Sequence, residues 1–236
     1  MCAKARSAFG YGSECIETEL PELASAAGKQ LTLWSPEGEP LHKFEPHAGA
    51  IAALGWDKPG RDLAAATNGA MVIHRIEPPR YVSRHYKWPA SCQTVAFSPN
   101  GRVIASGMQD GSLHFWYLSN ARDSQMRGYP GKVNLTSWSG DSRWLASNAA
   151  NEVVCWDFSG KGPEGSRPVQ LSGHTDRIEC LAFQPAGSYL VSAGRDWRLS
   201  LWQPGKAKQA LDAHLTDSEP SCLRWSPDGR HVAVGE

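Results

Sequence analysis

Residues 171–202 read LSGHTDRIECLAFQPAGSYLVSAGRDWRLSLW, and this stretch decides the fold. It contains three short apolar runs, IECLAF, YLVSA and RLSLW, separated by turns that carry Pro, Gly or Asp. Short runs rich in β-branched and aromatic residues and bounded by turn residues are typical of β-strands. The stretch therefore predicts three antiparallel strands in close succession.

The same pattern recurs along the chain. Apolar runs that end in an aromatic residue and lead into a polar turn have their aromatic residues 41, 41, 45 and 42 apart, at Trp56, Phe97, Trp138, Phe183 and Trp225. A second series of runs has its last residues 40, 42, 40 and 46 apart, at Trp34, His74, Trp116, Trp156 and Trp202. With a third short run and a polar fourth strand between these markers, the shared period predicts a four-stranded antiparallel sheet in each repeat.

Several motifs in these repeats resemble WD40 repeats. They are the pair Gly173–His174, the turns FSPNG and WSPDG, the stretch ASGMQDGSLHFW at 105–116 and the pair Trp156–Asp157. The resemblance covers residues 22–236 and implies an all-β fold, a β-propeller of four-stranded antiparallel blades. We expect an irregular segment at 1–21, a partial blade at 22–45, blades at 46–88, 89–128, 129–172 and 173–213, and a partial blade at 214–236.

About five repeats are visible, and both ends of the pattern supply a second strand. Two arrangements stay open: a five-bladed ring whose ends share a blade, or part of a seven-bladed ring that lacks about two blades. We expect the second, an incomplete chain. An open array exposes sheet faces and edges, so self-association is also expected.

His174, Ser192 and Asp196 are the three residue types of a hydrolase triad. A catalytic serine needs an exposed, strained turn and an oxyanion hole. Ser192 instead lies inside the run YLVSA, with no GxSxG motif around it. The sequence therefore favours a structural role over catalysis.

The WD40 resemblance supplies that structural role as a hydrogen-bonded tetrad. It implies that His174, Ser192, Asp196 and Trp202 form one tetrad in the blade 173–213. In the blade 89–128 it implies part of a second, because Ser106, Asp110 and Trp116 recur at the same mutual spacing. Other repeats keep the tetrad only in part. The blade 46–88 has His47 in the histidine place, Ala65 in the serine place and His74 in the tryptophan place, and the blade 89–128 has Trp88 in the histidine place. The blade 129–172 has Tyr129 in the histidine place with Ser147 and Trp156, and the partial blade 22–45 has Ser25 with Trp34.

Candidate partner-binding residues follow from the same resemblance, which implies docking on the face that bears the turns after the second strand. The matching positions are Arg195 and Gln109, with Arg177 near the entry of its first strand. The segment PPRYVSRHYKWP at 78–89 adds Tyr86 and Trp88. It is either a charged edge strand or a binding patch, and both interpretations stay open.

Composition limits the class of partner. Lys plus Arg is 24 and Asp plus Glu is 24, so the net charge is zero and no basic surface for nucleic acid or for a membrane is indicated. No long apolar run or secretory signal is present, and we expect a cytoplasmic protein. Neither the six cysteines nor the eight histidines show metal-ligand spacing, so no metal or other cofactor is expected.

The sequence thus predicts a WD40-type scaffold that binds protein partners and has no catalysis of its own. Two alternatives stay open. One is a ligand-binding or enzymatic propeller with a site in the central channel. The other is the propeller part of a larger signalling protein.

Overall fold

The computed structural model describes residues 23–236, and this part of the chain contains strands and no helix. The first sheet comprises β1 (Leu23–Ala27), β2 (Gln30–Trp34) and β3 (Pro40–Lys43). The second comprises β4 (Ile51–Trp56), β5 (Asp62–Glu77) and β6 (Arg80–Ser91). The third comprises β7 (Ala96–Phe97), β8 (Val103–Gly107), β9 (Leu113–Tyr117) and β10 (Asp123–Met126).

Three more sheets follow along the chain. The fourth comprises β11 (Thr136–Trp138), β12 (Trp144–Ala149), β13 (Glu152–Asp157) and β14 (Val169–Ser172). The fifth comprises β15 (Ile178–Phe183), β16 (Leu190–Gly194), β17 (Arg198–Trp202) and β18 (Asp212–Leu215). The sixth comprises β19 (Cys222–Trp225) and β20 (Val232–Gly235). Each strand pairs antiparallel with the next one in its sheet, as the repeated turns predict.

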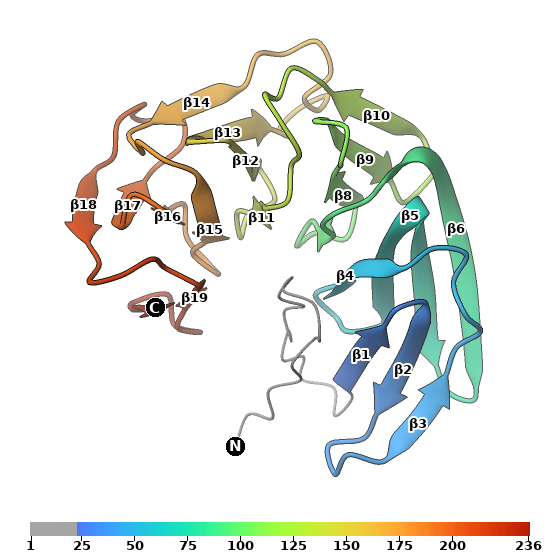
Figure 1. The fold of residues 1–236 in the computed structure, drawn as a ribbon. Coiled ribbons are helices and arrows are strands. Elements are labelled where there is room, and N and C mark those ends of the chain that lie inside the picture. The colour runs from blue at the N-terminus through green and yellow to red at the C-terminus, as the bar shows by residue number, and fades with distance from the viewer. Residues whose placement is uncertain (1–22) are drawn as a thin grey trace.

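The six sheets follow one another around an arc in sequence order (Figure 1). The first strand of each later sheet, such as β11 or β15, lies toward the inside of the arc, and the fourth, such as β14 or β18, lies outside. This is the arrangement of propeller blades. Within residues 23–236 no sheet contains strands from both ends of the chain, so the described ends do not share a blade.

Strand β5 supplies two of the expected strands, because it folds back on itself at Asn68–Gly69. The Ile76 amide donates to the Arg61 carbonyl at 2.8 Å, and Thr67 Oγ1 donates to the Ala70 carbonyl at 2.7 Å across the turn. Gly69 has a φ of 88°, which glycine adopts without the steric cost of a Cβ atom. The second sheet therefore has the four-stranded form of its neighbours.

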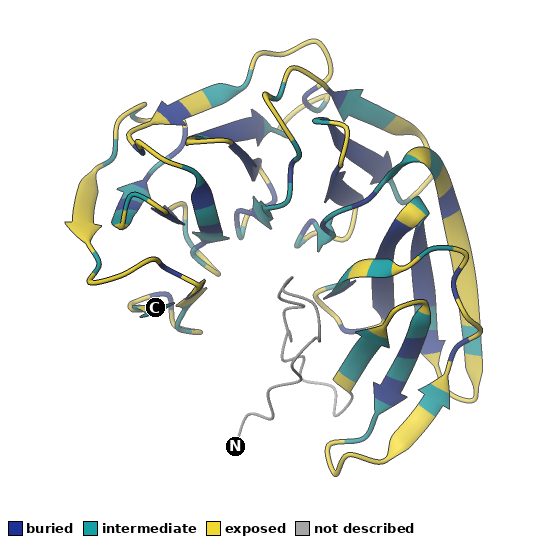
Figure 2. Ribbon diagram, in the orientation of Figure 1, coloured by how far each residue is buried: buried dark blue, intermediate teal, exposed yellow. Residues whose placement is uncertain are grey.

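The hydrophobic core lies between successive sheets (Figure 2). Leu33 and Leu63 pack between the first two sheets, and Phe115 and Val154 pack between the third and fourth. The clusters between the other neighbours are built in the same way. Because each sheet buries its faces against the next, the blades are stable as an array rather than singly.

The aromatic residues that mark the period also connect neighbouring sheets. Trp138 Nε1 donates to the Ala96 carbonyl at 3.1 Å, and Trp225 Nε1 donates to the Ala182 carbonyl at 3.0 Å. Each indole thus reaches the first strand of the preceding repeat. This contact explains why a tryptophan recurs at the end of a first strand.

The turns divide the array into two faces. The upper face carries the turns between second and third strands, which are residues 108–112, 150–151 and 195–197. The lower face carries the turns between first and second strands, which are residues 98–102, 139–143 and 184–189. Because neighbouring strands are antiparallel, these two sets of turns lie at opposite ends of the strands.

Candidate functional site

The structure brings His174, Ser192, Asp196 and Trp202 together beneath the upper face of the fifth sheet. His174 Nδ1 lies 2.9 Å from Asp196 Oδ1, and His174 Nε2 lies 2.7 Å from Ser192 Oγ. Trp202 Nε1 donates to Ser192 Oγ at 2.7 Å. A carboxylate can only accept, so Nδ1 of neutral His174 carries the proton and Nε2 accepts from the serine hydroxyl.

This order of donors and acceptors is also that of a hydrolase triad. Burial distinguishes a structural tetrad from a catalytic triad. Ser192 is 0% exposed, and its oxygen is occupied by the Trp202 indole, so a substrate carbonyl has no approach to it in the folded chain. The arrangement connects β16, β17 and the segment before β15 by hydrogen bonds, and it does not present a nucleophile.

Asp196 also holds the turn that follows β16. Its carboxylate accepts from the Thr175 amide at 2.9 Å and from the Arg198 amide at 3.3 Å. Burial opposes ionisation of Asp196, but the hydrogen bonds from His174 and Thr175 outweigh it, and the pKa of the carboxyl is lowered. The tetrad therefore fixes residues 195–197 at the surface.

The third sheet does not form the tetrad that the matching spacing predicts. Ser106 Oγ donates to the Thr94 carbonyl at 2.6 Å, and Asp110 Oδ1 accepts from Ser112 Oγ at 2.6 Å. Trp116 is buried against other rings, including His114 at 4.3 Å between centroids. No histidine precedes the first strand of this sheet at the matching position, so no side chain there joins Ser106 to Asp110 by hydrogen bonds.

Two other sheets use different residues at the same places. In the fourth, Tyr129 Oη stands where the histidine would be: it contacts Ser147 Oγ at 2.8 Å and accepts from Trp156 Nε1 at 2.8 Å. In the first, Trp34 Nε1 donates directly to Ser25 Oγ at 2.7 Å. Burial raises the pKa of Tyr129 to about 12, so the phenol is neutral.

In the second sheet two histidines replace the tetrad. His47 Nε2 and His74 Nε2 lie 3.0 Å apart, His47 Nδ1 lies 3.2 Å from the Lys29 carbonyl, and His74 Nδ1 lies 2.8 Å from Ser83 Oγ. The carbonyl can only accept, so Nδ1 of neutral His47 donates, His74 Nε2 donates to His47, and Ser83 donates to His74. Burial, followed by His47 and His85, lowers the pKa of His74 to about 3.

On the upper face of the fifth sheet, two of the predicted contact residues lie in one ion-pair group. Arg195 Nε lies 2.8 Å from Glu179 Oε1 and 3.1 Å from Glu219 Oε1, and Arg177 Nε lies 3.3 Å from Glu179 Oε1. The Arg195 side chain remains half exposed. Both arginines share the carboxylate of Glu179, and arginine is enriched among the residues that dominate binding in protein interfaces.

Sequence reasoning missed the largest side chain of this surface. Trp197 is 51% exposed and has a φ of 58°, in the left-handed region that a bulky residue rarely adopts. Its carbonyl accepts from the Thr216 amide at 2.8 Å, next to Leu215, which is 76% exposed. The unusual Trp after Asp196, where the third sheet has Gly111, was the available signal.

We define the upper-face patch as Arg177, Arg195, Trp197 and Leu215. Its members combine an aromatic ring, an aliphatic side chain and two guanidinium groups. A solvent-exposed tryptophan in strained backbone geometry points to function rather than to folding.

The matches with known proteins agree with this geometry. The family model "WD domain, G-beta repeat" matches residues 80–117, 165–203 and 205–236. These three stretches have the sequence pattern of WD40 repeats. WD40 domains in general are non-catalytic interaction domains, which agrees with the buried serine.

Curated relatives with WD40-type similarity come from several organisms. The chain is 25% identical to the 66 kDa stress protein of Physarum polycephalum, over 78% of this chain and 31% of the relative. It is 30% identical to THO complex subunit 3 of Arabidopsis thaliana, over 47% of this chain and 36% of the relative. It is 24% identical to WD repeat-containing protein 1 of Gallus gallus, over 79% and 31%. The chain thus spans about a third of the length of these relatives.

The WD40 array does not bring all predicted contact residues to one surface. Gln109 is exposed on the upper face, but on the third sheet. Tyr86 is only 9% exposed and packs with Trp116, and Trp88 lies against His114 at 3.8 Å between centroids. Tyr86 belongs to the core between the second and third sheets, and the partly buried Trp88 packs against it. On the edge strand β6 both side chains face the neighbouring sheet, and their contact with a partner stays a prediction.

Within residues 23–236, no group of His, Cys, Asp or Glu side chains is arranged to hold a metal ion. In the same range, no helix is long and apolar enough to cross a membrane.

Proposed function

We propose that this chain is a WD40 interaction module that mediates assembly of a protein complex, has no catalysis of its own, and binds a protein partner through the upper-face patch. The observation that carries the proposal is the position of Trp197. It is half exposed, it lies in the same turn as Arg195, and that turn is held from below by Asp196. Trp and Arg are enriched among the residues that dominate binding energy in protein interfaces.

The comparisons support the general part of this proposal. WD40 relatives include a protein named as a subunit of the THO complex, so the repeat type occurs in protein assemblies. The chain covers only part of each relative, so the partner and the activity of the whole protein belong to the proposal. The proposal also includes a cytoplasmic location for the protein.

The proposed lack of catalysis follows from the tetrad. Its serine and histidine are ordered as in a triad but are 0% and 4% exposed. The indole of Trp202 occupies the serine oxygen that an acyl substrate would have to approach. We infer that the tetrad contributes to the stability of the fold, as do the buried hydrogen bonds at the same places in other sheets.

Quantitative capture from a cell extract tests the docking surface. The bait carries Arg177→Glu with Arg195→Glu, and the matched control carries Arg122→Glu with Arg230→Glu, two exposed arginines of the lower face. Both pairs change the net charge equally. We expect at least one protein to be retained by the wild type and the control but lost from the upper-face variant. An identical set of captured proteins for all three baits would contradict the proposed surface.

A further inference from the structure

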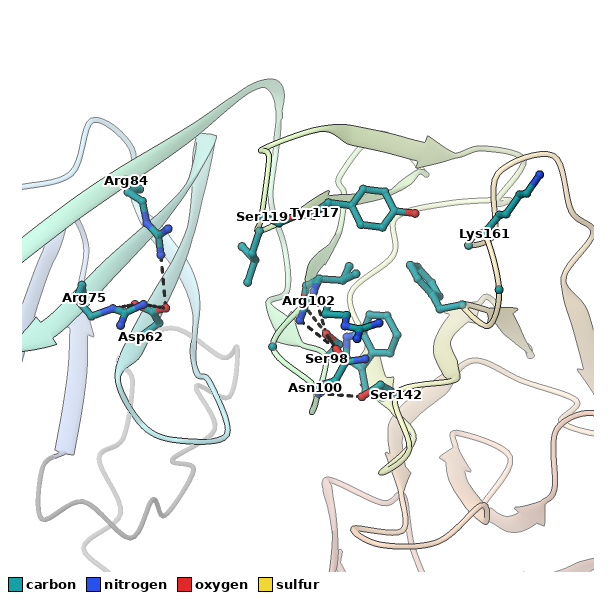
Figure 3. A pocket seen from close by; sticks show the side chains of 17 residues that line it. Asp62, Arg75, Arg84, Ser98, Asn100, Arg102, Tyr117, Ser119, Ser142 and Lys161 are labelled. Carbon is teal, nitrogen blue, oxygen red and sulfur yellow. Dashed lines mark hydrogen bonds and ion pairs between the residues drawn. The ribbon is translucent and has the colours of Figure 1, made fainter.

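A pocket of about 600 Å³ opens on the lower face, opposite the upper-face patch. Three successive sheets contribute to it: Asp62, Arg75 and Arg84 come from the second, Ser98, residues 100–102 and Tyr117 from the third, and Ser142 and Lys161 from the fourth. Its volume is within the range of ligand-binding pockets. Figure 3 shows the cationic side chains on both sides of it.

The charge of the pocket is strongly one-sided, although the whole chain is neutral. Four cations line it, Arg75, Arg84, Arg102 and Lys161, against the single carboxylate of Asp62. Arg75 occupies that carboxylate with two hydrogen bonds, from Nε to Oδ1 at 2.6 Å and from Nη2 to Oδ2 at 2.9 Å. Arg84 lies farther from it, at 3.5 Å.

The remaining cations are free to bind a ligand. Arg102 and Lys161 are exposed and make no ion pair within the described part of the chain. Two further acidic groups lie at the edge of the pocket: Glu77 pairs with Arg75 at 3.4 Å, and Glu164 contacts Tyr117 Oη at 3.1 Å and pairs with Arg122, a cation outside the lining, at 3.2 Å. The pocket therefore presents an uncompensated positive charge.

Polar groups and rings complete the lining. Ser142 has a φ of 62°, and its Oγ accepts from the Asn100 amide at 2.9 Å, which joins the third and fourth sheets. Trp138 and Phe158 form an edge-to-face pair at 4.6 Å beside these polar groups. Hydroxyl groups and cations suit an oxyanion, and the rings suit the organic group that carries it.

We propose that this pocket binds an oxyanion, either a phosphate or a carboxylate, presented by a peptide segment of a protein. Arginine clusters recognise phosphorylated and acidic peptide motifs through paired N–H groups. The four lining cations surround one pocket, whereas a nucleic-acid strand is bound along an extended track of cations. A peptide is therefore the better match to the charge pattern. The proposal is independent of the upper-face patch.

Fluorescence anisotropy with short labelled peptides tests the pocket. The probes are one peptide with phosphoserine at its centre, the same peptide with glutamate there, and the same peptide with serine. Unlabelled inorganic phosphate and a short single-stranded RNA serve as competitors. We expect saturable binding of at least one oxyanion peptide, and the ratio of the two affinities identifies the source of the oxyanion. The serine peptide should bind at least about tenfold more weakly.

The variants Arg102→Glu and Lys161→Glu remove the two free cations, and circular dichroism checks that they fold. Each should weaken peptide binding by about tenfold or more, whereas Arg195→Glu on the opposite face should leave it unchanged. Four results would overturn the proposal: no saturable binding of either oxyanion peptide, unchanged binding in both pocket variants, inorganic phosphate binding as tightly as the peptides, or preferred binding of RNA. The variant Arg177→Glu with Arg195→Glu should lose capture of the protein partner but keep peptide binding. That result would distinguish the upper-face patch from the lower-face pocket.

Discussion

Ser192 and Ser200 lie directly opposite each other on the paired strands β16 and β17, and both side chains are fully buried. Their hydrogen bonding differs. Ser192 Oγ contacts His174 and Trp202, whereas Ser200 Oγ has no hydrogen-bond partner among the described residues. Replacing each of these two paired serines therefore distinguishes the contribution of the tetrad to stability from the contribution of a buried hydroxyl alone.

Ser192→Ala should lower the free energy of unfolding by about 1–3 kcal/mol, because it leaves the His174 and Trp202 nitrogens buried without a partner. The matched Ser200→Ala removes only an unsatisfied hydroxyl, so it should be neutral or stabilising. Urea denaturation of both variants measures the difference. Equal losses of stability would show that the tetrad contributes nothing specific.

Tyr129→Phe should be destabilising for the same reason. The phenol oxygen joins Trp156 Nε1 and Ser147 Oγ in the fourth sheet, and its loss leaves a buried indole N–H unpaired, at a cost of about 1–3 kcal/mol. Tyr189→Phe is the control, because Tyr189 is 38% exposed on the lower face. Thermal unfolding followed by circular dichroism should show a lower Tm for Tyr129→Phe alone. A Tm equal to that of the control would show that Tyr129 does not take the structural place of the tetrad histidine.

The pair His47–His74 predicts a loss of stability in mild acid. Burial holds the pKa of His74 at about 3, whereas in the unfolded chain it titrates near 6.5. The unfolded state therefore binds the proton first, and stability that is present above about pH 6.5 decreases as the pH falls toward 3. His42 and His85 lie near the pair, stand on the neighbouring strands and add only positive charge on protonation.

For this group alone, the free energy of unfolding should be on the order of 1 kcal/mol lower at about pH 5.5 than at about pH 7.5. His74→Gln should remove that part of the decrease, because the amide does not titrate. His214→Gln, at a solvent-exposed histidine, should leave the decrease unchanged. Urea denaturation at both pH values gives the comparison, and an undiminished decrease in His74→Gln would rule out this origin.

Trp197 should show opposite effects on stability and on binding. Its left-handed backbone is strained for a bulky residue, and Asn tolerates that conformation. Trp197→Asn should therefore leave the free energy of unfolding unchanged or raise it by up to about 1 kcal/mol, while capture of the partner falls. Tyr189→Asn, an exposed aromatic position with no such strain, should keep capture intact. If Trp197→Asn retains full capture, the exposed ring has no binding role.

The sequence predicted the repeated sheets because strand ends, turns and aromatic residues share one period, and the tryptophans physically connect neighbouring repeats. It also pointed to the arrangement of Tyr129, Ser147 and Trp156. It could not show that Ser106 and Asp110 would bond to other groups instead of forming a tetrad, since that depends on a missing partner from another strand. It could not show the inward orientation of Tyr86 and Trp88 either, because an edge strand with mixed residues has no alternation that fixes its faces.

Photo-crosslinking at position 197 tests the proposed docking surface most directly. A benzoylphenylalanine side chain replaces Trp197 in one protein and Tyr189, at the opposite end of the same sheet, in another. Both proteins are irradiated in cell extract, and adducts are identified by mass spectrometry. We predict a discrete adduct with a protein partner from position 197 and none with that partner from position 189. Adducts from position 189 alone, or the same adducts from both positions, would contradict binding through the upper-face patch.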